Sequence, residues 1–389
     1  MFKVLTLNNI SIVGLEKLPR DNYEVASEIQ HPDAILLRSF KMHDMEIPET
    51  LKAVGRAGTG VNNIPLDKMT EKGVVVFNAP GANANAVKEL VLAGMLMACR
   101  NIGPAWNFAC ALEGTDEEIS KQVESGKKNY GGFELPGKTI GVVGLGAIGR
   151  SVANMAKDLG MNVIGFDPGL TVEGAWQISS SVQQANTFDE MLPKVDFVTF
   201  HVPLIDVTKN MLNADRIKLM KDTAIILNFA RNGIIDENAI VERLNNKKLY
   251  GYVCDFPSNG LKNVPGVVTL PHLGASTSDA EDNCAVIVSE NVKDYLENGN
   301  IKLSVNFPEV DMPRNGNCTR LTVSNKNEPN MLGQISTILA DANLNIIDMV
   351  NKSKKDVAYT IVDVDSEISE SIVSSIKAIK GVLSVRVLS

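Results

Sequence analysis

Residues that commonly build metal sites and disulfide frameworks are scarce in this chain. Its 389 residues include five cysteines and four histidines, and no two cysteines form a CxxC pair. An odd number of scattered cysteines favours reduced thiols over a zinc site or a set of disulfides. We therefore expect a cytoplasmic protein that holds no metal.

Long apolar runs and clustered positive charge are also missing. The longest apolar stretch, Val87–Cys99, is interrupted by Lys88 and Glu89, and a membrane-spanning helix needs ~18 uninterrupted apolar residues. Met1–Val13 lacks the basic segment and continuous apolar core of a signal peptide. The formal net charge is −8, whereas sequence-independent binding to nucleic acid needs clustered lysine and arginine. We expect neither a membrane nor a nucleic-acid partner.

The composition is otherwise that of a globular protein, with 44% hydrophobic and 22% charged residues over a length that suits two or three domains. From Lys138 onward, β-rich runs alternate with helical or loop stretches. The six runs are Ile140–Val143, Asn162–Phe166, Phe197–His201, Ala224–Phe229, Gly251–Cys254 and Val267–Leu270. Near-continuous apolar strands joined by crossovers predict an α/β fold with a doubly wound parallel sheet.

Each of these runs ends in, or is followed by, a residue suited to binding or chemistry. In chain order they are the glycine turn Gly144–Gly149, Asp167, His201, Arg231, Asp255 and His272. Ligands of open α/β sheets bind outside the carboxyl ends of the strands, so this recurrence predicts a single active cleft.

The glycine turn predicts a dinucleotide site. Its first glycine makes the tight turn, its second lets the backbone approach the pyrophosphate, and its third permits helix–sheet packing. The cofactor contacts expected from the turn are Gly144, Gly146, Ala147, Ile148 and Gly149. Asp167 follows near the ~20-residue spacing expected for the acid that accepts the ribose hydroxyls. No arginine follows Asp167 to hold a 2′-phosphate, which favours NAD over NADP.

His272 and Arg231 are the candidate catalytic residues. Hydride transfer from a hydroxy acid needs a base for the hydroxyl proton and a cation for the carboxylate. Either residue alone could be structural, His272 as a packed histidine and Arg231 as a surface ion-pair partner. Their positions at adjacent strand ends favour the catalytic interpretation.

These residues together resemble the D-isomer-specific 2-hydroxyacid dehydrogenases over about residues 1–306. The resemblance also includes His201-Val202-Pro203, Asn228-Phe229-Ala230-Arg231, Asp255 and Pro271-His272. It implies that His272 is the acid–base residue and that Arg231 binds the substrate carboxylate. It further implies that Asp255 contacts the nicotinamide carboxamide and that His201 and Pro203 line the cofactor pocket. A packed strand residue remains an alternative for His201.

The amino-terminal part has its own strand-like runs, at Lys3–Leu7, Ala34–Leu37, Ala53–Arg56 and Val74–Phe77. By resemblance it is a discontinuous, flavodoxin-like substrate domain. The expected substrate residues are Arg38, Ser39, Lys41, Arg56, Gly58 and Asn62. Its bases could bind a phosphate, which suits a phosphorylated substrate in an otherwise acidic protein. Each of these charges could equally be a solvated surface group.

One family feature is absent. The family places a glutamate between the Asp255 position and the histidine, whereas residues 256–271 contain neither Asp nor Glu. Asn232 also replaces the family's glycine after the arginine. His272 could act without the carboxylate, since a histidine titrates near neutral pH. Alternatively, Asp279 or Glu281 could replace it, or the activity could be altered.

The carboxyl-terminal stretch, which ends in the strand-like run Val382–Leu388, reads as a βαββαβ unit and resembles an ACT domain, a module that binds amino acids between paired copies. The resemblance implies a serine effector held by Asn325, Asn327 and Asn345, although these asparagines could instead cap a turn and a helix. Paired modules and the family dimer imply a homo-oligomer, either a dimer or a tetramer.

The expected organisation has four parts. They are a substrate domain at 1–85 and 280–306, an NAD domain at 86–279, a linker at 307–316 and an ACT domain at 317–389. Within the family, the resemblance is strongest to members that oxidise 3-phosphoglycerate with NAD. Two alternatives are reduction of hydroxypyruvate or glyoxylate, and an NAD-sensing corepressor-like binding protein.

Overall fold

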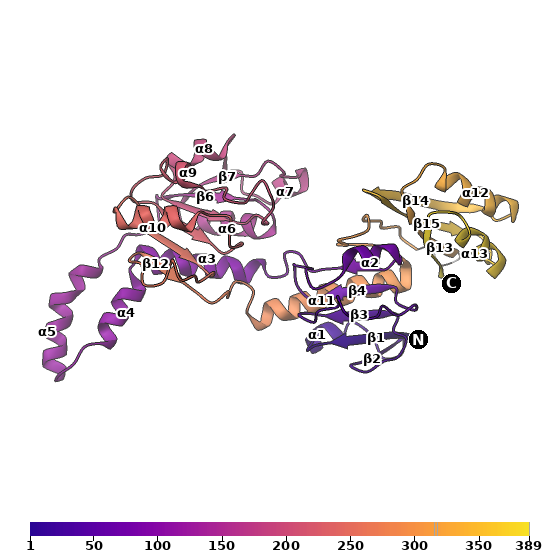
Figure 1. Ribbon diagram of the computed structural model, residues 1–389, viewed down its shortest axis with the longest axis horizontal. Helices are drawn as coiled ribbons and strands as arrows, with labels where there is room; N and C mark the ends of the chain where they lie inside the picture. Colours follow the sequence, from indigo (N-terminus) through magenta and orange to yellow (C-terminus); the bar gives the residue numbers. More distant parts are fainter. Residues whose placement is uncertain (315, 317, 389) are drawn as a thin grey trace. The chain divides into compact units, whose positions relative to one another are not determined.

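The computed structural model of the chain describes residues 1–314, 316 and 318–388 (Figure 1). The limits expected for the ACT domain, Asn317 and Ser389, and the expected linker residue Asn315 lie outside the described residues. The chain forms two compact units, of which the first joins Met1–Ala82 to the chain from Ser278 onward. The second unit is Asn83–Thr277.

The first unit contains a five-stranded parallel sheet in the order β2-β1-β3-β4-β5. Its strands are β1 (Phe2–Leu7), β2 (Tyr23–Ala26), β3 (Ala34–Leu37), β4 (Ala53–Arg56) and β5 (Val75–Phe77). This order is that of flavodoxin-like folds, so the expected fold is confirmed. The edge strand β2 was missed, because only Tyr23 among its residues is buried and the run lacks a continuous apolar pattern.

Three helices accompany this sheet: α1 (Ile12–Leu15), α2 (Leu66–Glu71) and α11 (Ser278–Asn298). Helix α11 buries Ala285, Val288 and Val292 in the core cluster that also contains residues of β1, β3 and β4. It crosses α1 closely, since a Cβ atom added at Gly14 would lie 2.5 Å from the Cβ of Ala285. The chain after residue 277 is thereby fixed to the amino-terminal sheet.

The second unit contains a seven-stranded parallel sheet in the order β12-β11-β10-β9-β6-β7-β8. Its strands are β6 (Thr139–Val143), β7 (Asn162–Phe166), β8 (Gln183–Gln184), β9 (Phe197–Phe200), β10 (Ile225–Asn228), β11 (Gly251–Cys254) and β12 (Val267–Thr269). Counted from β6, this is the dinucleotide-binding order with one strand added, and it confirms the doubly wound sheet. The short strand β8 was missed because both of its glutamines are exposed.

Helices and 3₁₀ turns surround the second sheet. They are α3 (Ala84–Cys99), α4 (Ile102–Cys110), α5 (Asp116–Gly126), η1 (Lys127–Tyr130), α6 (Ala147–Asp158), α7 (Val172–Trp176), α8 (Phe188–Met191), η2 (Leu192–Lys194), α9 (Ala214–Ile217) and α10 (Glu237–Asn245). Helices α4 and α5 extend away from the sheet as a hairpin (Figure 1). Neither helix has a buried residue, and Trp106 of α4 is 69% exposed.

The carboxyl-terminal module has the element order β13 (Thr319–Lys326), α12 (Met331–Asp341), β14 (Ile346–Lys354), β15 (Val357–Val364), α13 (Glu370–Lys377) and β16 (Val382–Leu388). Its antiparallel sheet has the order β14-β15-β13-β16. The predicted βαββαβ fold of the ACT type is confirmed. Leu321, Val323, Ile335 and Leu339 belong to its separate core.

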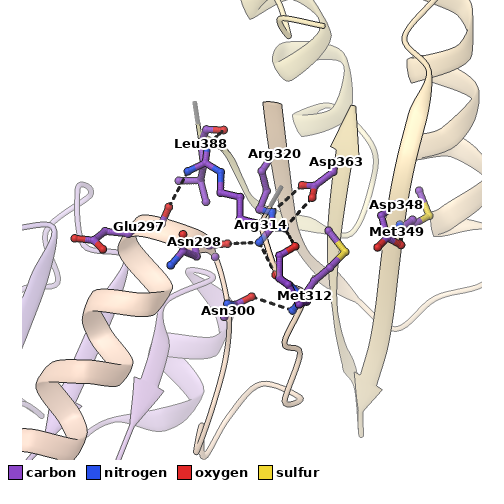
Figure 2. Close-up of polar contacts among 12 residues, drawn as sticks. Glu297, Asn298, Asn300, Met312, Arg314, Arg320, Asp348, Met349, Asp363 and Leu388 are labelled. Carbon is purple, nitrogen blue, oxygen red and sulfur yellow. Dashed lines mark hydrogen bonds and ion pairs between the residues drawn. The ribbon is translucent and has the colours of Figure 1, made fainter. Parts of the chain in front are cut away.

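Donors from this module and from the chain before it cap the carboxyl end of α11, and Figure 2 shows part of this junction. Arg386 donates to the carbonyls of residues 295 and 296, Arg314 to that of 297, Arg320 to that of 298 and the hydroxyl of Tyr359 to that of 299. The carbonyls of residues 296–298, which end the helix, and that of Gly299 directly after it therefore have partners, while the carbonyl of Tyr295 accepts both Arg386 and the N–H of Gly299. The module and the amino-terminal sheet consequently form one folded unit.

Within the described residues, no helix is both long enough and apolar enough to cross a membrane.

Candidate active site and cofactor site

The glycine turn joins β6 to α6 in the second unit. Gly144 has φ +85°, a left-handed conformation that favours glycine, and its N–H donates to the carbonyl of Phe166. A Cβ atom added at Gly149 would lie 1.8 Å from the carbonyl oxygen of Gly144. At Gly146 the same atom would meet nothing within 4 Å, so this side of the turn is open.

The amino terminus of α6 is available to an anion. Gly146 is its capping residue, and no side chain among the described residues caps the first N–H groups of the helix. Such groups, together with the helix dipole, stabilise a pyrophosphate. Ala147 and Ile148 form the first turn of α6, where the sequence placed their cofactor contacts.

Asp167 lies beside the turn at the end of β7. Its Oδ2 accepts the N–H of Leu145 at 2.7 Å and its Oδ1 accepts that of Gly169 at 2.8 Å. A carboxylate oxygen has a second lone pair, so each oxygen can still accept a ribose hydroxyl. Asp167, Gly144 and Pro203 all line one cavity of about 660 Å³, which is large enough for part of a dinucleotide.

Apolar residues of this cavity were not identified from the sequence. They include Val143, Phe166, Phe188, Val202, Ile205, Val207 and Met211. Ile205 and Val207 are 53% and 80% exposed, respectively. The mostly apolar segment Val202–Val207, which follows His201 at the end of β9, is the signal that could have revealed this wall.

His201 is placed differently from Pro203. It is not among the residues that line the cavity. Its Nε2 lies 3.0 Å from the hydroxyl of Thr199, and its buried Nδ1 has no hydrogen-bond partner among the described residues. Burial lowers the pKa of His201 to about 3, so its ring is neutral at physiological pH. This geometry matches the packed-strand alternative for the side chain, while its backbone carbonyl lies against Gly144.

Asp255, directly after β11, is a buried carboxylate with one free oxygen. Its side chain is almost fully buried, its Oδ2 accepts the N–H of Gly274 at 3.1 Å, and its Oδ1 has no partner among the described residues. Burial raises the pKa of Asp255, and the Gly274 N–H and the charges of His272 and Arg231 act in the opposite direction. An unpaired buried acceptor is costly, and the NH₂ group of a nicotinamide carboxamide would satisfy it.

His272 and Arg231 occupy neighbouring loops around Asp255. The N–H of His272 donates to the backbone carbonyl of Asp255 at 3.0 Å, and this contact holds the residue at φ +51°. The imidazole is exposed and packs edge-on against Phe256, with ring centroids 5.3 Å apart. Arg231 is also exposed and donates to the carbonyl of Ala230. The structure therefore brings a proton acceptor, a cation and a buried carboxylate to one end of the sheet.

Glu281, one of the two acids considered for the missing glutamate, belongs to the first unit. Its carboxylate pairs with Arg38 at 2.6 Å, and both side chains are about 40% exposed. Asp279 lies in the first turn of the same helix, α11. Among the described residues, no carboxylate forms a hydrogen bond with the His272 imidazole.

The candidate substrate residues of the first unit gather around Arg38. The Nε of Arg56 donates to the carbonyl of Arg38 at 3.1 Å. Gly58 packs against the guanidinium of Arg56, since an added Cβ atom would lie 1.7 Å from Nη1. Burial raises the pKa of Cys284 and the charges of Arg56 and Arg38 lower it, which places this thiol beside them. A compact basic cluster thus stands at the carboxyl ends of β3 and β4.

Two asparagines that the sequence did not single out support this cluster. Asn8 accepts the N–H groups of Ser39 and Phe40, and Asn63 donates to the carbonyls of Arg38 and Phe40. Lys41 and Asn62 are exposed beside them. Only the fold reveals these contacts, because the partners are far apart in sequence.

The effector residues lie in the carboxyl-terminal module. Asn325 is buried on β13, where its amide donates to the carbonyl of Lys326 and its Oδ1 has no partner among the described residues. The Asn327 amide donates to the carbonyl of Lys355, and the N–H of Asn345 donates to Asp365. Asn330 takes φ +66° at the start of α12, a conformation that asparagine tolerates where glycine is usual.

The described residues contain no group of three or more His, Cys, Asp or Glu side chains that could hold a metal ion. The two parallel sheets, the glycine turn and the strand-end residues together define an α/β dehydrogenase with a dinucleotide cofactor. The family model for the NAD binding domain of D-isomer specific 2-hydroxyacid dehydrogenases matches residues 92–274.

Curated relatives cover most of the chain. The D-3-phosphoglycerate dehydrogenase of Haemophilus influenzae is 32% identical over 382 residues, which are 95% of this chain and 89% of the relative. That of Escherichia coli K12 is 31% identical and covers 87% of this chain and 82% of its own length. The chain belongs to the D-isomer-specific 2-hydroxyacid dehydrogenase family. The Methanocaldococcus jannaschii enzyme is 36% identical, and the chain spans only 61% of that longer protein.

Solved structures agree on the fold. The NAD⁺-bound 3-phosphoglycerate dehydrogenase of Entamoeba histolytica is 24% identical, with a TM-score of 0.60 over 78% of this chain and 98% of that one. D-2-hydroxyisocaproate dehydrogenase is 22% identical, with a TM-score of 0.65 over 78% of this chain and all of the other. NAD is the cofactor of this chain. The uncapped helix terminus and the free oxygen of Asp255 fit this cofactor.

Proposed function

We propose that the chain oxidises 3-phosphoglycerate to 3-phosphohydroxypyruvate with NAD, as a D-3-phosphoglycerate dehydrogenase in the first step of L-serine biosynthesis. The observation that carries this proposal is a set of relatives with that name, 31–36% identical over 77–95% of the chain. The basic cluster of Arg38 and Arg56 supports it, since a phosphorylated substrate needs local cations in a chain of net charge −8.

The proposed chemistry follows from the residues of each unit. NAD supplies the acceptor for the hydride that leaves the substrate carbon. His272 takes the hydroxyl proton and becomes imidazolium, while the hydride reduces the cofactor and the alcohol becomes a ketone. Arg231 holds the substrate carboxylate, Asp255 orients the nicotinamide through its free oxygen, and Arg38 with Arg56 binds the phosphate. Glu281 would have to release Arg38 for a full contact with phosphate.

The test measures NADH absorbance with purified protein, NAD and three separate substrates: 3-phosphoglycerate, glycerate and D-lactate. The proposal expects the highest kcat/KM for 3-phosphoglycerate. The Arg38→Gln variant should raise KM for 3-phosphoglycerate by about ten-fold and leave KM for glycerate nearly unchanged, because only one substrate carries the phosphate.

Other outcomes would replace the proposal. Preference for glycerate, or for hydroxypyruvate and glyoxylate in the reverse direction, would identify a different 2-hydroxyacid dehydrogenase. Saturable NAD binding without turnover of any substrate would favour an NAD-sensing binding protein.

We further propose that L-serine is an effector bound at Asn325, Asn327 and Asn345. The buried, unpartnered Oδ1 of Asn325 supports a ligand at this position, because an amino group could donate to it. Serine should slow turnover of the full chain, whereas D-serine, the control, should not. Equal inhibition of a chain that ends at Phe307 would exclude the module as the sensor.

We also propose that the protein is a cytoplasmic homo-oligomer, either a dimer or a tetramer. Cys99, Cys110, Cys254 and Cys284 form no disulfide, which suits a reducing compartment. The hairpin of α4 and α5 has no buried residue and exposes Trp106, which suits a surface that a second copy covers. Sedimentation velocity should show an oligomer, and Trp106→Asp should shift it to smaller species. An unchanged sedimentation coefficient would exclude this surface.

A further inference from the structure

A cavity of about 540 Å³ lies in the first unit, where the carboxyl-terminal module meets the amino-terminal sheet. Its walls come from β1, the residue before β4, the end of α11 and β16. The residues that matter for its chemistry are Phe2, Lys52, Leu296, Glu297, Arg314 and Arg386. None of them belongs to the cofactor site, to the basic cluster at Arg38 or to the asparagines of the module.

The cavity is positively charged in an acidic protein. It is lined by three basic side chains and one acidic one. Lys52 pairs with Asp33 at 2.5 Å, and the Oε1 of Glu297 accepts the hydroxyl of Tyr23 at 2.8 Å. Among the described residues, neither Arg314 nor Arg386 has a carboxylate partner. Both guanidinium groups therefore contact backbone carbonyls but no carboxylate, and an anionic ligand would supply the missing counter-charge.

Both arginines are fixed in place and keep free donors. Each donates through Nη1 and Nη2 to two backbone carbonyls, at residues 295 and 296 for Arg386 and at 297 and 388 for Arg314. A guanidinium has five N–H donors, so part of each remains for another acceptor. Arg386 also stacks on the ring of Tyr295, with its Cζ 4.5 Å from the ring centroid. Such anchoring lowers the entropy lost when a ligand binds.

The remaining wall is apolar. Phe2, Leu296, Val385 and Val387 line it. We propose that this cavity binds a small organic anion, whose carboxylate or phosphate group faces Arg314 and Arg386 while its carbon skeleton contacts the apolar wall. The ligand would bridge two parts of the first unit and stabilise their docked arrangement by mass action. This proposal does not depend on the reaction that the chain catalyses.

The experiment is isothermal titration calorimetry on the full-length chain in the Arg38→Gln background, which weakens anion binding at the basic cluster. Citrate and inorganic phosphate are the two probes, and they distinguish a carboxylate ligand from a phosphate ligand. We expect saturable binding of at least one probe, near one per chain, and a higher thermal midpoint in its presence.

Substitutions locate the site. In the same background, Arg386→Gln and Arg314→Gln should each weaken binding about ten-fold, because each removes a charged contact. Lys17→Gln is the matched control, since it removes a lysine of the same unit that pairs with Glu290 outside the cavity. If circular dichroism shows that an arginine variant is misfolded, Lys52→Gln decides, because this partly exposed side chain also lines the cavity. Absence of saturable binding of both probes, or equal affinity of the cavity variants and the control, would overturn the proposal.

Discussion

Replacing Asp363 by asparagine would leave the guanidinium of Arg320 buried without a counter-charge. Arg320 is fully buried on β13. The carboxylate of Asp363 on β15 accepts hydrogen bonds from its Nε and Nη2 at 2.7 and 2.8 Å. Three backbone carbonyls, of Asn298, Met312 and Pro313, accept its other N–H groups (Figure 2). Removing one partner of a buried ion pair costs about 3–5 kcal/mol. The carbonyls remain in place, so we expect the lower value, about 3 kcal/mol.

The assay is thermal and urea unfolding of the full-length variant. A loss of about 3 kcal/mol lowers the midpoint of a unit of this size by roughly 6–12 °C. Lys121→Gln is the control, because it removes an exposed (i, i+4) pair with Glu117, worth at most about 0.5 kcal/mol. The double variant Arg320→Met/Asp363→Leu should recover part of the loss, since no buried charge remains. If Asp363→Asn cost no more than the control, the claim that this pair fastens the module would be wrong.

Three further predictions concern the second unit. His272→Asn should lower kcat by about 10²-fold or more while NAD affinity stays within a factor of two to three of the original; unchanged turnover would refute the assignment. Gly149→Ala should unfold or strongly destabilise the unit, since its Cβ would lie 1.8 Å from the Gly144 carbonyl oxygen. Gly146→Ala should fold normally, because nothing lies within 4 Å of the added Cβ atom, but it should lose NAD affinity, because that atom keeps the backbone away from the pyrophosphate. Burial raises the pKa of Asp255, so the folded state binds its proton more tightly and loses stability as pH rises above the ordinary carboxyl range. Asp255→Asn should therefore raise the thermal midpoint at pH 7 and weaken NAD binding, and an unchanged pH dependence of stability would contradict this.

The sheets and the glycine turn could be predicted because their signals are local. Continuous apolar runs mark the central strands, and the turn needs glycine at φ +85° and at a contact that admits no Cβ atom. The strands β2 and β8 carry no such run, since they lie at sheet edges. The hairpin of α4 and α5 was missed for the same reason, because its helices have no buried stripe.

The polar architecture could be predicted only in part. Strand-end positions singled out Asp255, Arg231 and His272, whose mutual proximity appears in the pKa of Asp255. The pairing of Arg38 with Glu281 joins residues that are far apart in sequence, and no pattern indicates it. Arg320 lies in a strand where an arginine is normally exposed, and its burial depends on Asp363 and on three carbonyls of other segments.

The capped end of α11 has a consequence for engineering. In the first turn of α11, Glu281 pairs with Arg38. At the other end of the helix, the carbonyls accept hydrogen bonds from Arg314, Arg320, Tyr359 and Arg386. A foreign sensor module joined only at the segment after Phe307 would bring none of these matched donors, and water alone would satisfy the last carbonyls of the helix. A functional graft must therefore transfer α11 with its module, or rebuild the arginine set on the new one.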